Sequence, residues 1–397
     1  MCGMNHDQQS LARLKSFINR DRMVETAVRL IEVPSPTGNA GAACARLAEI
    51  LAAEGFAVER PDGGHPVAPA VVVRLDGGQP GRTIQFDGHL DTVHLPFVPP
   101  KVENGLIKGS GASDMKGGVA AAVEALRAVR DSGALQAGAI LLTAHDLHEA
   151  PWGDGRQLDR LIREGYTGDA VLLPEPLCDV LPVAGRGSAT WKVHIRRAGS
   201  PVHEVMRPRD EPSVIAAGAR LVAELGRLEA KLAAEVHPVC GSPSVFIGQI
   251  HSGEIYNQYP QECWIEGTRR WLPGTEPKAV ETEFRSLLNQ LGLDTRTQTD
   301  CDWFFIRDGF QLDVADPFVS LFQRTFQAIS GQPLPEGPKP FVDDGNSFWA
   351  IKDIPAITHG PRAGGAHTVA EWIDIDDMVR VALLYAASAL EYCSLPR

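Results

Sequence analysis

Two kinds of hydrophobic pattern alternate along the first half of this 397-residue chain. Some segments repeat apolar residues with the period of a helix, and others are short apolar or β-branched runs typical of buried strands. Helices are expected at residues 11–33, 41–55 and 117–129, and strands at residues 71–73, 83–86, 139–143 and 170–173. This alternation predicts an α/β sheet with helices on its faces.

The pattern changes near Gly185. Strands are expected at residues 189–196, 244–250 and 262–270, and amphipathic helices at residues 213–232 and 277–291. The order β-α-β-β-α predicts a small α+β domain with an antiparallel sheet. From about residue 311 the α/β pattern returns and ends in a helix expected at residues 375–392.

Composition excludes several classes of partner. The net charge of −12 argues against nucleic acid and anionic membranes, since both favour basic patches. The seven cysteines are scattered and form no C-x-x-C pair, so neither a disulfide framework nor a thiolate zinc site is indicated. This usage favours a reducing cytoplasm. The polar first ten residues lack a signal-peptide core, and no apolar run approaches the roughly 20 residues that span a bilayer.

Acids and histidines recur in five short segments, at residues 86–93, 111–118, 148–149, 174–176 and 365–368. No segment alone is specific, because each residue also has an ordinary structural interpretation. Together they supply imidazoles and carboxylates that suit one or two zinc-like ions. The set predicts a metal-dependent hydrolase.

The positions of these residues relative to the expected strands support a site. His89 and Asp91 follow a strand, at the end where α/β proteins place their ligands. His89 can then bind a metal while Asp91 accepts the proton of its other ring nitrogen. Glu175 follows another strand, and Asp114 lies in a glycine-rich turn where its two oxygens can bridge two cations. His367 lies in a glycine-rich loop, where the backbone can approach a site closely.

In combination, these motifs resemble the family of dinuclear metallohydrolases that includes aminoacylase, acetylornithine deacetylase, succinyl-diaminopimelate desuccinylase, glutamate carboxypeptidase and peptidase T. That family has H-x-D on a strand, then D-x-K-G-G, two adjacent glutamates, a further acid and a C-terminal histidine. The resemblance implies the metal ligands His89, Asp114, Glu149, Glu175 and His367. It also implies two divalent ions, zinc first, with manganese or cobalt possible because mixed O/N ligands select weakly.

The resemblance further implies a mixed-sheet catalytic domain of zinc-aminopeptidase type with an inserted α+β domain that acts as a lid and dimerises. With His367 among the ligands, residues 1–184 and 305–397 form the catalytic domain and residues 185–304 the insertion. In relatives a histidine of the lid, matched here by His203, reaches the partner subunit's site and stabilises the oxyanion. Asn257 and Arg270 match positions that hold the substrate, although Arg270 reads equally well as a surface residue.

One motif departs from the family. Relatives have T-x-D-E-E, in which the first glutamate is the general base and the second a metal ligand. Residues 143–149 here read T-A-H-D-L-H-E, so the pair has become His148-Glu149 and lies two residues later. Either Glu149 is the ligand and His148 takes the place of the base, or Glu149 is the base and His148, Asp146 or nothing fills the metal position. Glu149 is essential in both interpretations.

The expected protein is thus a cytoplasmic, homodimeric hydrolase of an amide or related C–N bond in a small carboxylate-bearing substrate, such as an N-acyl amino acid or dipeptide. Two alternatives stay open: a hydrolytic deaminase of an aromatic amine at the same metal site, and a non-catalytic binding protein on the same fold.

Overall fold

The computed structural model describes residues 8–151 and 153–396, and it divides into two compact units. Unit 1 comprises Met1–Val183, Gln311–Pro338 and Asp343–Arg397, and unit 2 comprises Ala184–Phe310 and Lys339–Val342. In the described part of the chain, no helix is both long and apolar enough to cross a membrane.

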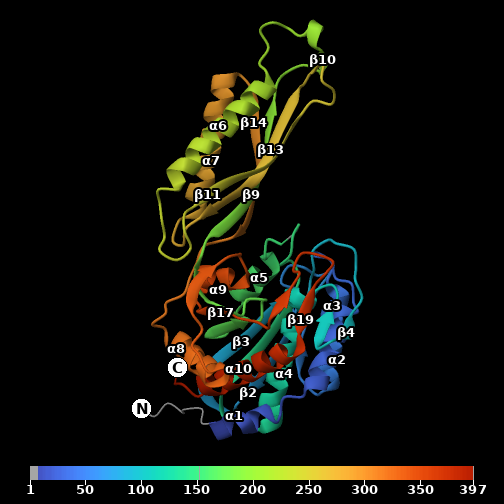
Figure 1. The fold of residues 1–397 in the computed structure, drawn as a ribbon, viewed down its shortest axis with the longest axis vertical. Helices are drawn as coiled ribbons and strands as arrows, with labels where there is room; N and C mark the ends of the chain where they lie inside the picture. Colours follow the sequence, from blue (N-terminus) through green and yellow to red (C-terminus); the bar gives the residue numbers. More distant parts are fainter. Residues whose placement is uncertain (1–7, 152, 397) are drawn as a thin grey trace. The chain divides into compact units, whose positions relative to one another are not determined.

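Unit 1 is built on a six-stranded sheet with the order β1-β2-β6-β3-β7-β17 (Figure 1). Its strands are β1 (Val58–Glu59), β2 (Val71–Asp76), β3 (Gln79–His89), β6 (Ala137–His145), β7 (Ala170–Leu173) and β17 (Ala356–Thr358). Strands β6, β3, β7 and β17 are mutually parallel. Strand β2 pairs antiparallel with β6, and β1 pairs antiparallel with β2. The mixed α/β fold predicted for the catalytic domain is confirmed.

Helices cover this sheet. They are α1 (Gln8–Lys15), α2 (Arg20–Ile31), α3 (Gly41–Ala53), α4 (Gly117–Ser132), α5 (Arg156–Glu164), α8 (Pro317–Ser330), α9 (Asp344–Lys352) and α10 (Ile375–Cys393), with a short helical turn η1 (Ala112–Lys116) before α4. The central helices α4 and α10 pack against each other and against β3 and β6, while α9 packs on β7 and β17. Every residue of α4 from Gly117 to Val129 is buried, which explains its alanine-rich sequence.

Two smaller sheets complete the fold around these elements. One has the order β18-β19-β5-β4 and the other the order β15-β8-β16. Their strands are β4 (Lys101–Glu103), β5 (Leu106–Lys108), β8 (Leu181–Gly185), β15 (Phe310–Gln311), β16 (Glu336–Lys339), β18 (Ala363–Gly364) and β19 (Trp372–Asp374).

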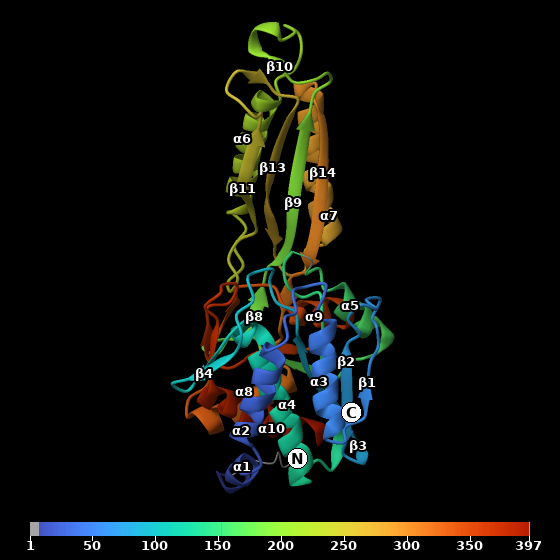
Figure 2. The same cartoon turned by 90° about the vertical axis from the view of Figure 1, so that its right-hand side faces the viewer.

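Unit 2 is a four-stranded antiparallel sheet, order β11-β13-β9-β14, with two long helices on one face (Figures 1 and 2). Its elements are β9 (Gly187–Arg196), β10 (Val202–His203), η2 (Glu204–Met206), α6 (Val214–Leu232), β11 (Ser244–Ser252), β12 (Gln258–Tyr259), β13 (Glu262–Trp271), α7 (Pro277–Thr295) and β14 (Gln298–Arg307). Leucines of α6 and α7 share a buried cluster with Trp191, Val193 and Ile265 of the sheet.

One expected helix is wrong as a single element. Residues 11–33 form two helices, because Asn19 has an extended backbone and its side chain accepts the N–H of Arg22, which caps the start of α2. The backbone N–H of Asn19 is in turn held by Glu124 of α4 at 2.7 Å. This long-range contact fixes the break between the two helices.

Candidate metal centre

Side chains with metal-binding chemistry gather where the parallel strands of unit 1 end. His89 closes β3, and it lies opposite His145 at the end of β6 in the strand register. Glu175 follows β7 by two residues. Because parallel strands end at one edge of a sheet, these residues meet there, as the sequence predicts.

Asp114 is brought to this edge by η1, and Glu371 holds that turn. The Glu371 carboxylate accepts backbone N–H groups from Gly111, Ser113 and Asp114, at 3.1, 3.1 and 3.2 Å. Burial raises the pKa of the Glu371 carboxyl to about 7. Sequence reasoning missed Glu371, and its only signal is an acid four residues after His367.

The spacing of donor atoms fits metal ions. Two ligand atoms about 2.0–2.1 Å from one ion lie about 3.3 Å apart at tetrahedral angles. The Nε2 atom of His89 lies 3.1 Å from Asp114 Oδ1 and 3.6 Å from Glu175 Oε1. The Nε2 atom of His367 lies 3.5 Å from Asp114 Oδ2 and 3.0 Å from Glu149 Oε2. The two oxygens of Asp114 therefore face two different groups of ligands.

The charges also fit a cation. Burial, followed by the neighbouring charge of Asp114, raises the pKa of Glu175 to about 7 and that of Glu149 above its usual value. Within the described part of the chain, the buried Oε1 of Glu175 accepts no hydrogen bond. Crowded carboxylates with an unused oxygen are relieved by a divalent ion.

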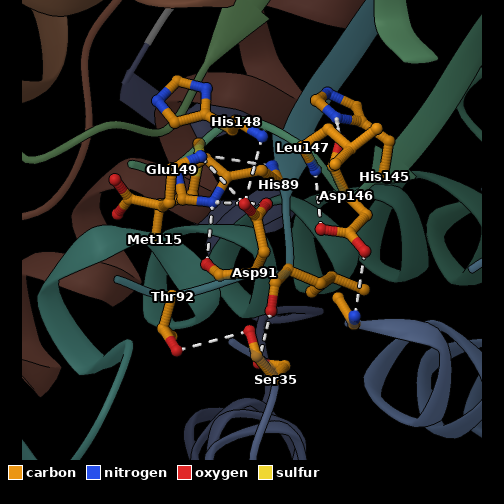
Figure 3. Close-up of polar contacts among 12 residues, drawn as sticks. Ser35, His89, Asp91, Thr92, Met115, His145, Asp146, Leu147, His148 and Glu149 are labelled. Atoms are coloured by element: carbon orange, nitrogen blue, oxygen red, sulfur yellow. Dashed lines mark hydrogen bonds and ion pairs between the residues drawn. The ribbon is translucent and has the colours of Figure 1, made fainter. Parts of the chain in front are cut away.

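Asp91 connects the ligand strand to the His148-Glu149 loop. The Nδ1 atom of His89 lies 3.0 Å from the backbone oxygen of Asp91 and 3.5 Å from its carboxylate, so Asp91 orients the ring. The other carboxylate oxygen accepts the backbone N–H groups of His148 and Glu149 at 3.1 and 2.8 Å, as Figure 3 shows. This second contact was not foreseen from the sequence.

His148 points into the cluster. Its ring stacks on His89 with 3.9 Å between centroids and 7° between planes. Its Nδ1 atom lies 2.9 Å from Asp344 Oδ2, and its Nε2 atom lies 3.6 Å from Glu175 Oε1. Atoms of His89, His148 and Glu175 form one group that could hold an ion, and atoms of His89, Asp114 and Glu149 form another.

Asp146 points away from the cluster (Figure 3). Its buried carboxylate accepts the backbone N–H groups of Gly38 and Ala40, both at 2.9 Å, and contacts His65 Nε2 at 3.1 Å. Of the residues considered for the altered motif, Asp146 is therefore committed to anchoring the loop before α3.

The three expected substrate residues lie in unit 2, whereas the metal-ligand candidates lie in unit 1. Asn257 Nδ2 is 3.1 Å from His203 Nε2, so these two residues are brought together. Arg270 is near the opposite end of β13, where it pairs with Ser188 and Ser244. Burial lowers the pKa of its guanidinium.

A two-sided cluster of imidazoles and carboxylates at the strand ends of an α/β sheet, largely buried except for the exposed His367, is typical of metal-dependent hydrolases. The sequence pattern of "Peptidase family M20/M25/M40" matches residues 86–391, and the chain belongs to this family. It is a metal-dependent hydrolase that acts on amide C–N bonds. The resemblance drawn from the sequence is confirmed.

Individual relatives agree with this assignment. The chain is 27% identical over 391 residues to a succinyl-diaminopimelate desuccinylase of Xanthobacter autotrophicus, covering 93% of this chain and 98% of the relative. It is 32% identical to one of Methylobacterium radiotolerans over 224 residues, 51% of this chain and 56% of the relative. The fold matches the aminopeptidase PepT of Bacillus cereus with a TM-score of 0.78 at 21% identity, covering 95% of this chain and 99% of that chain.

Proposed function

We propose that this chain hydrolyses the amide bond of a small substrate with a free carboxylate, of the N-acyl amino acid or dipeptide type, using two divalent metal ions. The observation that carries the proposal is the two-sided ligand cluster around Asp114. The names of the relatives, desuccinylase and aminopeptidase, agree with such a substrate. No observation favours the aromatic deaminase or the binding protein.

We assign the ligands as two groups that share Asp114. One group comprises Glu149 and His367, with Glu149 Oε2 3.0 Å from His367 Nε2. The other group comprises His89 and Glu175. Zinc is the proposed metal, because the sites combine imidazole and carboxylate ligands, and cobalt or manganese are expected to substitute. Bound ions of this kind supply a hydroxide nucleophile near neutral pH and polarise the scissile carbonyl.

The protein residues orient the reaction. Asp91 holds the ring of His89 and the backbone of the His148-Glu149 loop in place. The imidazole of His203, contributed across a dimer, is proposed to stabilise the developing negative charge, with Asn257 as its hydrogen-bond partner. Arg270 is proposed to bind the substrate carboxylate through its forked donors.

Unit 2 is proposed as the lid and the dimer interface. Its strand β11 is a sheet edge that exposes Phe246 and Ile250 at 63% and 53%, and the adjoining helix α6 exposes Ile215 at 53%. Light scattering on the purified chain measures the mass; a monomer at micromolar concentration would contradict this part of the proposal.

A reducing compartment such as the cytoplasm is proposed from the cysteines. Cys44, Cys178, Cys240, Cys263, Cys301 and Cys393 are free thiols. Burial raises the pKa of Cys44 to about 12, which keeps that thiol protonated and unreactive.

Glu149→Gln tests the ligand assignment together with the function. We expect purified wild-type protein to hold close to two ions per chain, and the variant to hold about one and to lose at least about 100-fold in kcat on N-acyl amino acids and dipeptides. Metal is measured by mass spectrometry and activity by release of the free amine.

An unchanged metal content with activity lost would make Glu149 the base. A wild-type chain that takes up no zinc or manganese would contradict the proposed function. Glu164→Gln, at the end of α5, is the control.

A further inference from the structure

Four side chains beside the ligand cluster form a continuous array, in which Asp87, His145 and Asp344 are buried and His148 is 11% exposed. His145 Nε2 lies 3.3 Å from Asp344 Oδ2 and 3.5 Å from Asp87 Oδ2. The same Asp344 oxygen lies 2.9 Å from His148 Nδ1. The array thus leads from the centre of the sheet to His148.

The array is built to hold Asp344. Asp343, the residue before it, caps α9 and forms a reciprocal capping box with Asn346. Asp343 is also tied to β17, because Thr358 Oγ1 donates to it at 2.6 Å. The start of α9 is therefore fixed, and Asp344, the first residue of the helix, is fixed with it.

The geometry fixes the tautomer of His148. An ionised carboxylate can only accept at Nδ1, so Nδ1 carries a proton. In the neutral imidazole the lone pair is then on Nε2, the atom that can bind a metal. That Nε2 lies 3.6 Å from Glu175 Oε1, the same distance that separates Glu175 Oε1 from His89 Nε2. Two parallel imidazoles 3.9 Å apart thus face one carboxylate oxygen that accepts no hydrogen bond in the described chain.

We infer that His148 is a further protein ligand, beside His89, Glu175 and the shared Asp114, to the metal ion on that side of the cluster, with Asp344 as the carboxylate that orients it. This inference rests on the proposed function and extends it. A histidine bound through Nε2 cannot accept the proton of the attacking water, so it does not act as the base that relatives have at this point of the motif. His145 and Asp87 are positioning residues that keep Asp344 in place.

The ligand set also predicts a metal preference. His89, His148, Glu175 and Asp114 give this position two imidazole nitrogens, whereas the position with Glu149, His367 and Asp114 has one. Imidazole favours zinc and cobalt over manganese and magnesium. The two positions should therefore differ in affinity for Co²⁺.

The test uses the full chain, stripped of metal by a chelator and titrated with Co²⁺ alone. We expect wild type to bind two equivalents, with three strongly shifted imidazole N–H proton resonances in the Co²⁺ protein, from His89, His148 and His367. His148→Gln should lose one such resonance and weaken one equivalent by more than about 10-fold. Asp344→Asn keeps the imidazole and should weaken the same equivalent by about 10–100-fold.

His194→Gln is the matched control, because His194 of β9 is also held between two carboxylates, Glu262 at 2.8 Å and Asp302 at 3.3 Å, in unit 2. It should bind Co²⁺ as wild type does. If folded His148→Gln still binds two equivalents of Co²⁺ with unchanged affinity and still shows three shifted imidazole resonances, His148 is not a ligand. The proposed function would then still stand. A wild-type chain that binds no Co²⁺ or Zn²⁺ would overturn both.

Discussion

At the scale of single residues, the histidine after β17 shows how strongly this fold can depress a pKa. His359 is fully buried, with its Nε2 atom 3.1 Å from Arg380 Nη1 and the rings of Phe322 and Phe326 edge-on to it. Burial, followed by the charge of Arg380, lowers the pKa of His359 to about 3, although Asp377 opposes the effect. A protonated His359 would place two cations against each other.

This depressed pKa predicts a loss of stability in acid. An unfolded histidine has a pKa of about 6.5, so below that pH the unfolded chain binds a proton that the folded chain refuses. The free energy of unfolding then falls by up to about 1.4 kcal/mol per pH unit between about 6.5 and 3. His359→Gln keeps an acceptor for Arg380 but cannot titrate. The free energy of unfolding of this variant, relative to that of wild type, should therefore rise by about 2 kcal/mol when the pH is lowered from 7 to 5.

Urea unfolding of both chains at pH 7, 6 and 5, with chelator present, measures this difference. Other titrating groups are common to both chains and cancel. His251→Gln, an exposed position on β11, should run parallel to wild type. Parallel curves for His359→Gln as well would show that His359 takes up its proton in the folded state.

The sequence predicts some site residues and not others for a physical reason. His89, Asp114 and His367 belong to short motifs whose neighbours in the chain signal their role. Glu371 acts on a partner 258 residues away in the chain, because its carboxylate accepts the backbone N–H of Ser113. Nothing local distinguishes this carboxylate from an exposed acid, so only the fold reveals it.

At the scale of elements, the start of α4 is set by two glycines at positions that leave no room for a Cβ atom. A Cβ on Gly118 would lie 2.0 Å from the carbonyl oxygen of Pro174, and one on Gly117 would lie 2.5 Å from that of Ala112. Helix α4 therefore packs directly on the backbone before Glu175, with no side chain between. This contact explains the paired glycines after Asp114 in the metal-binding motif.

Gly118→Ala should destabilise the chain by about 1–3 kcal/mol, because the overpacking outweighs the roughly 1 kcal/mol that alanine gains in helix propensity. Thermal or urea unfolding measures the change. The control is Gly226→Ala in the exposed part of α6, where a Cβ meets no atom within 4 Å, and this variant should be stabilised by about 0.5–1 kcal/mol. A Gly118→Ala chain as stable as wild type would mean that the Pro174 backbone shifts freely.

Periodicity predicted most elements well and failed at particular places. The expected strand at residues 170–173 and helix at residues 213–232 agree with β7 and α6 within one residue. Strand β14 was missed, because an edge strand of a half-covered sheet mixes Asp300 and Asp302 with Phe304 and Phe305 and shows no clean alternation. The insertion was expected at residues 185–304, whereas unit 2 comprises Ala184–Phe310 and also the short segment Lys339–Val342.

At the scale of the whole molecule, the two units have separate sources of stability. Unit 2 has its own core, in which Leu288 of α7 packs with Trp191 and Leu221. The ligand cluster belongs to unit 1. A unit with its own core can unfold on its own, and an ion stabilises only the unit that binds it.

Calorimetry of the full chain should therefore resolve two unfolding transitions. Zinc at about 100 times its Kd should raise only one of them, by about 2.7 kcal/mol of unfolding free energy for each ion bound. Leu288→Ala leaves a cavity at a side chain that is only 3% exposed, so it should lower the unfolding free energy of the other transition by about 2–5 kcal/mol. Leu293→Ala, on the same helix but 77% exposed, should leave both transitions unchanged. A single transition moved by zinc and by Leu288→Ala alike would show that the two units fold as one cooperative body, and the metal affinity of the cluster would then depend on the core of unit 2.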